Sequence, residues 1–322
     1  MIANSGEYRK KNGQRGYVMM NNFIFENKTK VYFGKGGVKE YLGGLLANSG
    51  ETIMLAYGGG SIKCNGVYDE IMGILNAQGK CVVEFSGIMS NPTYAKVQDG
   101  AKLARENHVD LILAVGGGSV SDCCKVISGA FDTLSHAMET YFGKPDENNL
   151  SDDINEAVMR SVIRNIRILL TDPENYDARS ELAQASAMAE NGVLKIGKVT
   201  DFQAHQIEHQ LGAYTNCNHG AGLAVIHPVL YRHIYKSGTA RFARFAQNVW
   251  GIAPKGSDGE TAAGIDALAA FIKEIGLPIS FAELGIPADT DFRAVADSTN
   301  ITAGCCKKLT HDEIYEILQE CL

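Results

Sequence analysis

Residues 199–228, VTDFQAHQIEHQLGAYTNCNHGAGLAVIHP, contain four of the eight histidines in this chain of 322 residues. His205 and His209 stand four residues apart in a run of helical period, so both imidazoles should project from one face of a helix. His219 follows the loop-like triplet 216–218 and precedes Gly220-Ala221-Gly222, which we expect to be flexible. The stretch therefore predicts that several imidazoles gather at one place in the fold.

A second pair with the same spacing lies upstream in FDTLSHAMETYF, where Asp132 and His136 stand four residues apart on an apolar helix. One carboxylate and two or three imidazoles facing inward suit Fe(II), Zn(II) or Mn(II). Taken alone, an H-x-x-x-H pair more often marks packing or surface histidines than a site, and the matched second pair is what favours a metal centre. The chain has no H-E-x-x-H, which argues against a zinc peptidase.

Composition places the chain among ordinary globular proteins, with 45% hydrophobic and 21% charged residues. Its length allows two domains, each with a core of its own. A net charge of -7 and a pI near 5.7 argue against nucleic acid and against an anionic membrane surface as partners. No apolar run approaches the length that a membrane span needs.

The eight cysteines indicate neither a disulfide framework nor a zinc knuckle, because they are scattered and no C-x-x-C occurs. Cys217 lies close to His219 in sequence and is a weaker candidate for a metal ligand. Since the sequence shows no signal peptide, we expect a protein of the reducing cytoplasm. The cysteines are Cys64, Cys81, Cys123, Cys124, Cys217, Cys305, Cys306 and Cys321.

Residues 1–19 differ from the rest of the chain, because they combine four basic residues with several Asn and Gly and lack an apolar stretch. They match neither a signal peptide nor a core helix. Met19 and Met20 stand just before the first patterned segment. We therefore expect the native chain to start there and residues 1–19 to be a disordered leader.

From Lys30 onward, short β-rich runs alternate with helical stretches, a pattern typical of a parallel sheet sandwiched between helices. The last of these runs is continuously apolar and is expected to be a buried strand. The expected strands are Lys30–Phe33, Thr52–Tyr57, Lys80–Phe85 and Leu111–Val115, and the expected helices are Val38–Ala47, Gly66–Ala77 and Thr93–Asn107.

Two GGGS clusters fall at the expected carboxyl ends of strands, where an open parallel sheet binds its ligands. Glycine lets backbone N–H groups approach a pyrophosphate, and the helix after the second cluster adds its positive end. One such cluster usually marks only a turn, whereas two in one sheet predict a nucleotide site. The candidate cofactor-binding residues are Gly58, Gly59, Gly60, Ser61, Gly116, Gly117, Gly118 and Ser119.

The residues after the second expected strand bear on the choice of cofactor. An NAD enzyme tends to place Asp or Glu there to bind the ribose 2'-hydroxyl. Here Tyr57 is followed by three glycines, Ser61 and Lys63, which offer room, a hydroxyl and a cation for a 2'-phosphate. The sequence therefore favours NADP(H) over NAD(H).

Beyond about Ile127 the pattern changes to successive helices with hardly a strand. Apolar residues within 154–169 form a helical stripe, and Thr310 and Glu313 form a capping box for the last helix. We expect a leader over 1–19, a dinucleotide-binding domain over 20–128, and a helical metal-binding domain over 129–322.

These motifs resemble those of the iron-containing, group III alcohol dehydrogenases, above all the NADPH-dependent butanol dehydrogenases and aldehyde reductases among them. The resemblance runs from about Asn21 to the C-terminus. It rests on FGKGGV, YGGGSIK, AVGGGSVSDCCK, FDTLSHAMETYF and HQIEHQLGAYTNCNHG, of which the last two are specific. It implies a Rossmann-like α/β N-terminal domain packed on an all-α metal-binding domain, the dehydroquinate synthase-like fold, with the active site between them.

The resemblance also implies a ligand set. The family's metal ligands fall on Asp132, His136, His205 and His219, whereas helical spacing alone ranks His209 above His219. The histidine that matches His209 lies near the nicotinamide and substrate in the family, and His209 is a candidate catalytic proton relay.

The remaining implications concern cofactor and partners. Asp122 and Lys125 match positions beside the cofactor-binding segments of the family. A divalent Fe(II) or Zn(II) would act as Lewis acid on an alcohol or carbonyl oxygen, while NADP(H), or else NAD(H), carries the hydride. The implied partners are a small-molecule alcohol or aldehyde and a second copy of the chain in a homodimer.

The chain departs from the family at one place. Several dozen residues normally separate the second GGGS segment from the helix with the Asp ligand, and they include a strand and a cofactor-contacting loop. Here residues 125–128 pass directly into 129–132, so part of the sheet and of the nicotinamide site is expected to be missing.

Three hypotheses follow from this departure. The first is an active NADP-dependent alcohol or aldehyde oxidoreductase with an intact ligand set. The second is a metal-binding remnant whose redox activity is impaired by the deletion. The third is a lyase on the dehydroquinate synthase-like fold, which the fingerprint residues disfavour.

Overall fold

The computed structural model describes residues 24–27, 30–88, 94–116, 123–145, 149–253, 258–304 and 306–322. The predicted leader over 1–19 lies outside these ranges. None of the helices within them combines the length and the hydrophobicity that crossing a bilayer requires.

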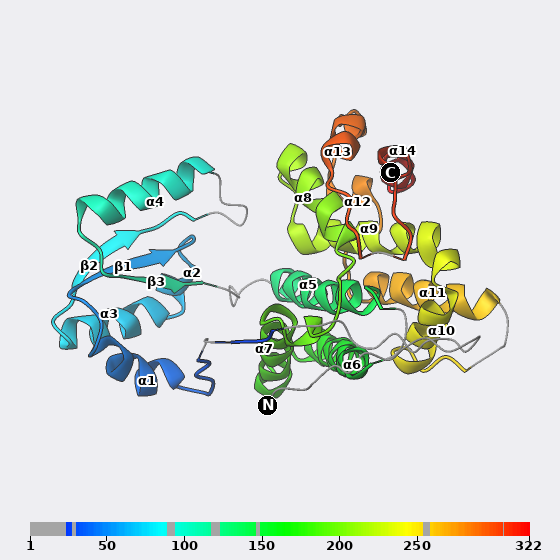
Figure 1. Ribbon diagram of the computed structural model, residues 1–322. Coiled ribbons are helices and arrows are strands. Elements are labelled where there is room, and N and C mark those ends of the chain that lie inside the picture. Colours follow the sequence, from blue (N-terminus) through cyan, green and yellow to red (C-terminus); the bar gives the residue numbers. More distant parts are fainter. Residues whose placement is uncertain are drawn as a thin grey trace.

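The described sheet has three parallel strands in the order β2-β1-β3. Figure 1 shows helices α1 and α3 on one face of this sheet and helix α4 on the other. The strands are β1 (Thr52–Tyr57), β2 (Cys81–Phe85) and β3 (Leu111–Val115), and the helices are α1 (Gly37–Leu46), α2 (Ser61–Cys64), α3 (Val67–Ala77) and α4 (Tyr94–Glu106).

Alternate residues of the central strand build the core under α1 and α3. Ile53, Leu55 and Tyr57 point to this face, where they join buried leucines and isoleucines of the two helices. On the other face, α4 approaches so closely that a Cβ on Gly100 would lie 2.9 Å from the Phe85 ring. The predicted sandwich of a parallel sheet between helices is confirmed.

Two expectations for the sheet are wrong. Lys30–Phe33 is not a strand: it is an exposed irregular segment, because no described strand pairs with it. β3 is only partly buried, with Leu111 37% and Ile112 59% exposed. β3 is the outer strand of the described sheet, so its apolar side chains lack the cover that an inner strand would have.

Beyond the sheet the described residues form helices and their connections, as predicted, and one isolated backbone bridge joins Lys144 and Val199 among them. A hydrophobic core separate from that of the sheet runs through this part, from Ala130 to Cys321. The predicted boundary near residue 128 falls within helix α5 and stays a prediction. The helices are α5 (Cys123–Tyr141), α6 (Leu150–Thr171), α7 (Tyr176–Glu190), α8 (Gln203–Thr215), α9 (His219–Ile234), α10 (Thr239–Asn248), α11 (Asp258–Glu274), α12 (Phe281–Leu284), α13 (Phe292–Ser298) and α14 (His311–Glu320).

Local signals explain where several helices begin. The predicted capping box of Thr310 and Glu313 is present at α14. A second one, formed by Asn149 and Asp152, begins α6. In each of these helices the backbone amides of the N-cap and N3 residues thus have side-chain partners.

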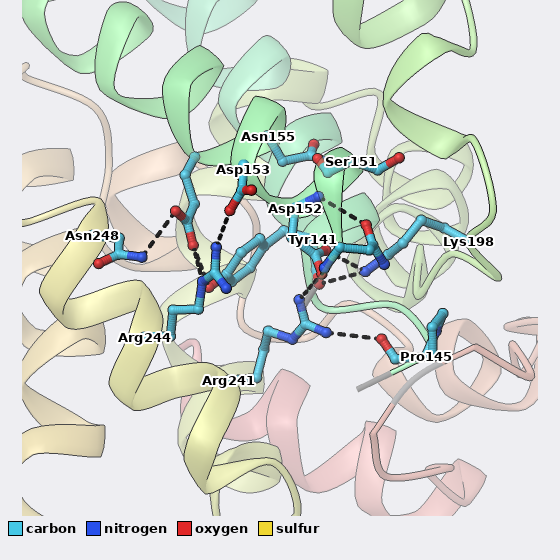
Figure 2. A network of polar contacts seen from close by, with 12 residues as sticks. Tyr141, Pro145, Ser151, Asp152, Asp153, Asn155, Lys198, Arg241, Arg244 and Asn248 are labelled. Atoms are coloured by element: carbon cyan, nitrogen blue, oxygen red, sulfur yellow. Dashed lines mark hydrogen bonds and ion pairs between the residues drawn. The ribbon is translucent and has the colours of Figure 1, made fainter. Parts of the chain in front are cut away.

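A buried network of charges fixes the segment that leads into α8 (Figure 2). Asp152 accepts from Lys198 Nζ at 2.6 Å and pairs with Arg241 Nη1 at 2.7 Å, and these side chains are 5% exposed or less. Lys198 also donates to the backbone carbonyl of Tyr141 at the end of α5. Because each buried charge has an opposite partner, the network holds the segment before α8 against α5.

Candidate metal centre and cofactor edge

Helices α5 and α8 bring three of the predicted ligands together. Asp132 Oδ1 lies 3.6 Å from His136 Nε2 and 3.4 Å from His205 Nε2. The Nε2 atoms of His136 and His205 are 3.1 Å apart. The i,i+4 spacing on α5 and the packing of α8 across it produce this convergence.

His219 enters the same cluster from the first turn of α9, with its Nε2 3.4 Å from Asp132 Oδ1. The expectation that Gly220-Ala221-Gly222 is flexible is wrong, because these residues form the buried first turn of α9. A Cβ on Gly220 would lie 2.2 Å from the Ser128 carbonyl oxygen of α5. Glycine is needed there for close approach of the two helices, which places His219 opposite Asp132.

Donor atoms of Asp132, His205 and His219 all lie within 4.8 Å of one another. His209 shares a second such group with Glu208 and His219, and its ring stacks on that of His219 at 5.4 Å between centroids. Cys217 belongs to neither group: its thiol is buried and faces Glu208. Proximity to Asp132 thus favours His219 over His209 and Cys217 as the fourth donor, beside Asp132, His136 and His205.

Two buried carboxylates that the sequence analysis missed orient the imidazoles. Glu139 accepts a hydrogen bond from His205 Nδ1, and Glu208 accepts one from His219 Nδ1. Both side chains are 2% exposed or less. Each bond places the proton on Nδ1 and leaves Nε2, which faces Asp132, as the donor to a cation. Glu139 lies three residues after His136, and Glu208 lies three residues after His205. This helical spacing is the sequence signal that could have identified both glutamates.

The electrostatics of this cluster favour positive charge. Burial lowers the pKa of His205, but the Glu139 and Asp132 carboxylates beside it raise it to about 9. Burial likewise lowers the pKa of His219, and the Asp132 and Glu208 carboxylates beside it raise it to about 10. Burial raises the pKa of Asp132, yet His205 and His219 hold it well below its usual range.

His136 behaves differently, because burial and the charge of His205 lower its pKa to about 4. In the absence of a metal, protons on His205 and His219 therefore balance the surrounding carboxylates. A divalent cation would take over this role by displacing them.

The residues fit such an ion on their own chemistry. Asp132 Oδ1 is buried and has no hydrogen-bond partner among the described residues, although three imidazole nitrogens surround it. An unpaired buried carboxylate oxygen is costly unless a cation binds it. One carboxylate and three imidazoles are a donor set that iron and zinc accept.

The sheet brings the two glycine segments to one edge. Tyr57, the last residue of β1, is paired with Val115, the last residue of β3, and Gly58 and Gly116 follow directly. Residues 117–122, which include Gly117, Gly118, Ser119 and Asp122, lie outside the described residues, and so does the side chain of Lys125. The described parts of both clusters thus lie where an open parallel sheet binds nucleotides.

Charged and phenolic groups surround the first glycine cluster. Glu84 accepts hydrogen bonds from Tyr57 at 2.5 Å and from Tyr68 at 2.6 Å, and lies 3.5 Å from Lys63 Nζ. Lys63 is half exposed and reaches over the Tyr68 ring at 4.5 Å. The cluster fixes Lys63 next to the turn that begins α2 at Ser61.

Comparison with known proteins identifies the class. The family model described as "Fe-containing alcohol dehydrogenase family, C-terminal" matches residues 126–322, and the model "Iron-containing alcohol dehydrogenase" matches residues 28–157. The chain therefore belongs to the iron-containing alcohol dehydrogenase family, which confirms the resemblance and the two-part fold.

Individual relatives are similar along nearly the whole chain. NADH-dependent butanol dehydrogenase A of Clostridium acetobutylicum is 28% identical over 94% of this chain and all of its own length. NADPH-dependent aldehyde reductase YqhD of Escherichia coli is 26% identical over 83% of this chain and 90% of its own. The crystal structure of NADH-dependent butanol dehydrogenase A from Thermotoga maritima superposes with a TM-score of 0.87 at 26% identity, covering 94% of this chain and 99% of that one.

These alignments also bear on the missing segment. The alignment with the Clostridium acetobutylicum enzyme extends over 389 residues, more than the 322 of this chain, so this chain lacks residues that the relative has. In the structure, only residues 116–122 separate β3 from α5. β3, the strand before this short connection, forms an edge of the described sheet.

Proposed function

We propose that this protein interconverts primary alcohols and aldehydes with NADP(H), using a divalent metal held by Asp132, His136, His205 and His219. Its family makes it an alcohol or aldehyde oxidoreductase that uses a metal and a nicotinamide cofactor. The observation that carries the ligand assignment is the buried, unpartnered Asp132 Oδ1 among three imidazole nitrogens.

The chain's own residues supply binding and orientation. Asp132 and the three Nε2 atoms would hold the ion, while Glu139 and Glu208 keep the protons of His205 and His219 on Nδ1. When bound, the metal supplies Lewis-acid polarisation of the substrate oxygen, and the nicotinamide supplies or accepts the hydride.

His209 is the proposed proton relay. Its side chain is exposed and stacks on His219, beside the cluster rather than within the Asp132 group. Partial burial and the charges of His205 and His219 lower its pKa, which favours the neutral ring that can accept a proton from an alcohol.

The preference for NADP(H) is proposed from the residues around the first glycine cluster. A Cβ on Gly59 or Gly60 would meet nothing within 4 Å, so the turn is open, and Ser61 offers a hydroxyl beside the Lys63 ammonium, which also lies 3.5 Å from Glu84 Oε2. The relatives include both NADH-dependent and NADPH-dependent enzymes.

We further propose that the protein is a cytoplasmic homodimer.

The test is an assay of purified protein loaded with Fe(II) or Zn(II), given butyraldehyde with NADPH or NADH, while cofactor absorbance is followed. We expect turnover that is faster with NADPH, and loss of both bound metal and turnover in His205→Ala. Stoichiometric metal without turnover would instead support the redox-impaired remnant. Tight dinucleotide binding without net oxidation would support the lyase.

A further inference from the structure

Glu190, the last residue of α7, reaches the ligand cluster from a third helix. Its Oε1 lies 2.8 Å from His136 Nε2. Neither the spacing of the histidines nor the family resemblance singles out this glutamate. It adds a second carboxylate beside Asp132 on the open side of the cluster, where Glu190 is 54% exposed.

The nitrogen that Glu190 contacts separates it from the two orienting carboxylates. Glu139 and Glu208 bind Nδ1 of their histidines, on the side away from Asp132. Glu190 instead contacts Nε2 of His136, the same atom that lies near His205 Nε2 and Asp132 Oδ1. Glu190 therefore lies on the side of the ring where the ion would be.

The separations match those between neighbouring ligands of one ion. Metal–ligand bonds of 2.0–2.2 Å at angles of 90–110° put adjacent donor atoms about 3.0–3.5 Å apart. The distances around His136 Nε2 are 2.8 Å to Glu190, 3.1 Å to His205 and 3.6 Å to Asp132. The contact between Glu190 and His136 thus has the length expected of two neighbouring ligands of one cation.

Two features of its position disfavour the negative charge of Glu190, and the Lys195 ammonium and the protonated His205 and His219 offset only part of this. It ends α7, where the helix dipole is negative, and the last turn of α7 contains no basic residue. It also brings a second carboxylate toward Asp132. A divalent ion would offset both repulsions, which gives this glutamate a physical reason to be there.

We propose that Glu190 is a fifth protein ligand of the metal centre. This inference rests on the proposed function, because it presupposes an ion at Asp132, His136, His205 and His219. Five protein donors leave one position of a six-coordinate ion for substrate oxygen. Such a set favours Fe(II), Mn(II) or Co(II) over Zn(II), which prefers four ligands in tetrahedral geometry.

The test compares metal binding by the metal-free full chain and its Glu190→Gln variant. Glu181→Gln is the matched control, since Glu181 is an exposed glutamate on the same helix that pairs with Arg164. Competition titrations with Mn(II) and Zn(II) give the affinity of each protein for these metals. The visible spectrum of the Co(II)-loaded protein reports the coordination number, because four-coordinate Co(II) absorbs more strongly than five- or six-coordinate Co(II).

We expect Glu190→Gln to weaken Mn(II) binding by about tenfold or more, to change Zn(II) binding less, and to intensify the Co(II) bands. Wild type and Glu181→Gln should behave alike. If Glu190→Gln matches Glu181→Gln in affinities and spectrum while wild type binds metal, Glu190 is no ligand and the proposed function stands. If wild type itself binds no metal, and His205→Ala does not differ from it, the proposed metal centre fails together with this inference.

Discussion

Replacing Glu139 by glutamine should weaken metal binding although Glu139 itself would not touch the ion. Its Oε2 accepts from His205 Nδ1, and its Oε1 accepts from the Ala204 amide at 2.5 Å. A glutamine whose oxygen keeps the bond to Ala204 turns its NH2 group toward His205 Nδ1. The imidazole proton then moves to Nε2, where it competes with the metal.

The magnitude follows from the bond that is lost. A hydrogen bond to a charged group contributes roughly 1.5–3 kcal/mol, and this one is fully buried. Since 1.4 kcal/mol corresponds to tenfold in affinity, metal binding should weaken by about 10- to 100-fold. Glu208→Gln, which alters the equivalent bond to His219, should have a similar effect.

The assay is a competition titration of metal-free protein with a chromophoric chelator. Glu274→Gln is the control, because Glu274 pairs with Arg167 at the surface of the helical part. Circular dichroism and denaturant unfolding without metal show whether the variants fold. A folded Glu139→Gln protein that binds metal as tightly as wild type would refute the argument that Glu139 sets the His205 tautomer.

Three further predictions address the cofactor turn, a helix contact and a buried histidine. Gly59→Asp has room for its Cβ and should weaken NADPH use by about tenfold through repulsion of the 2'-phosphate. An unchanged cofactor preference relative to Gly59→Ala would contradict the NADP(H) assignment. Gly220→Ala puts a Cβ 2.2 Å from the Ser128 carbonyl oxygen, so it should lower the free energy of unfolding by about 1–3 kcal/mol and weaken metal binding. The control Gly129→Ala, whose Cβ would meet nothing within 4 Å, should change neither quantity. Burial lowers the pKa of His227 from 6.5 to about 4, so the unfolded state binds the extra proton and stability falls as pH drops through this window. Between pH 7 and pH 5 the loss should be about 2 kcal/mol larger in wild type than in His227→Gln, and equal losses by denaturant unfolding would disprove the role of His227.

The sequence predicts those features that local periodicity and capping determine. β1 and β3 have the predicted bounds, and the capping box at Thr310 begins α14. The i,i+4 spacing of Asp132 and His136 likewise predicts that these two side chains lie on the same face of α5, because helix geometry alone decides which side chains share a face.

Features that depend on contacts between distant segments are not predicted. Lys30–Phe33 has strand-like residues but finds no strand to pair with, and the apolar pattern of β3 does not reveal that it forms an edge. The glycines after His219 suggest a loop, but they serve the close contact between α9 and α5.

Within the site, the histidines are conspicuous in the sequence because they are rare, whereas the glutamates are not. Glu139, Glu190 and Glu208 are three of many acidic residues, and only the packing of α5, α7 and α8 shows that they converge on imidazole nitrogens. A search for carboxylates at helical spacing from each histidine would have found two of them, Glu139 and Glu208.

The central claim is that one divalent cation lies among Asp132, His136, His205 and His219. Anomalous diffraction from crystals of the Fe(II)- or Zn(II)-loaded protein tests it most directly. The account predicts one strong peak about 2.0–2.2 Å from Asp132 Oδ1 and from the three Nε2 atoms. A fully loaded protein whose peak lies elsewhere, or whose ion contacts fewer than three of these residues, would contradict it.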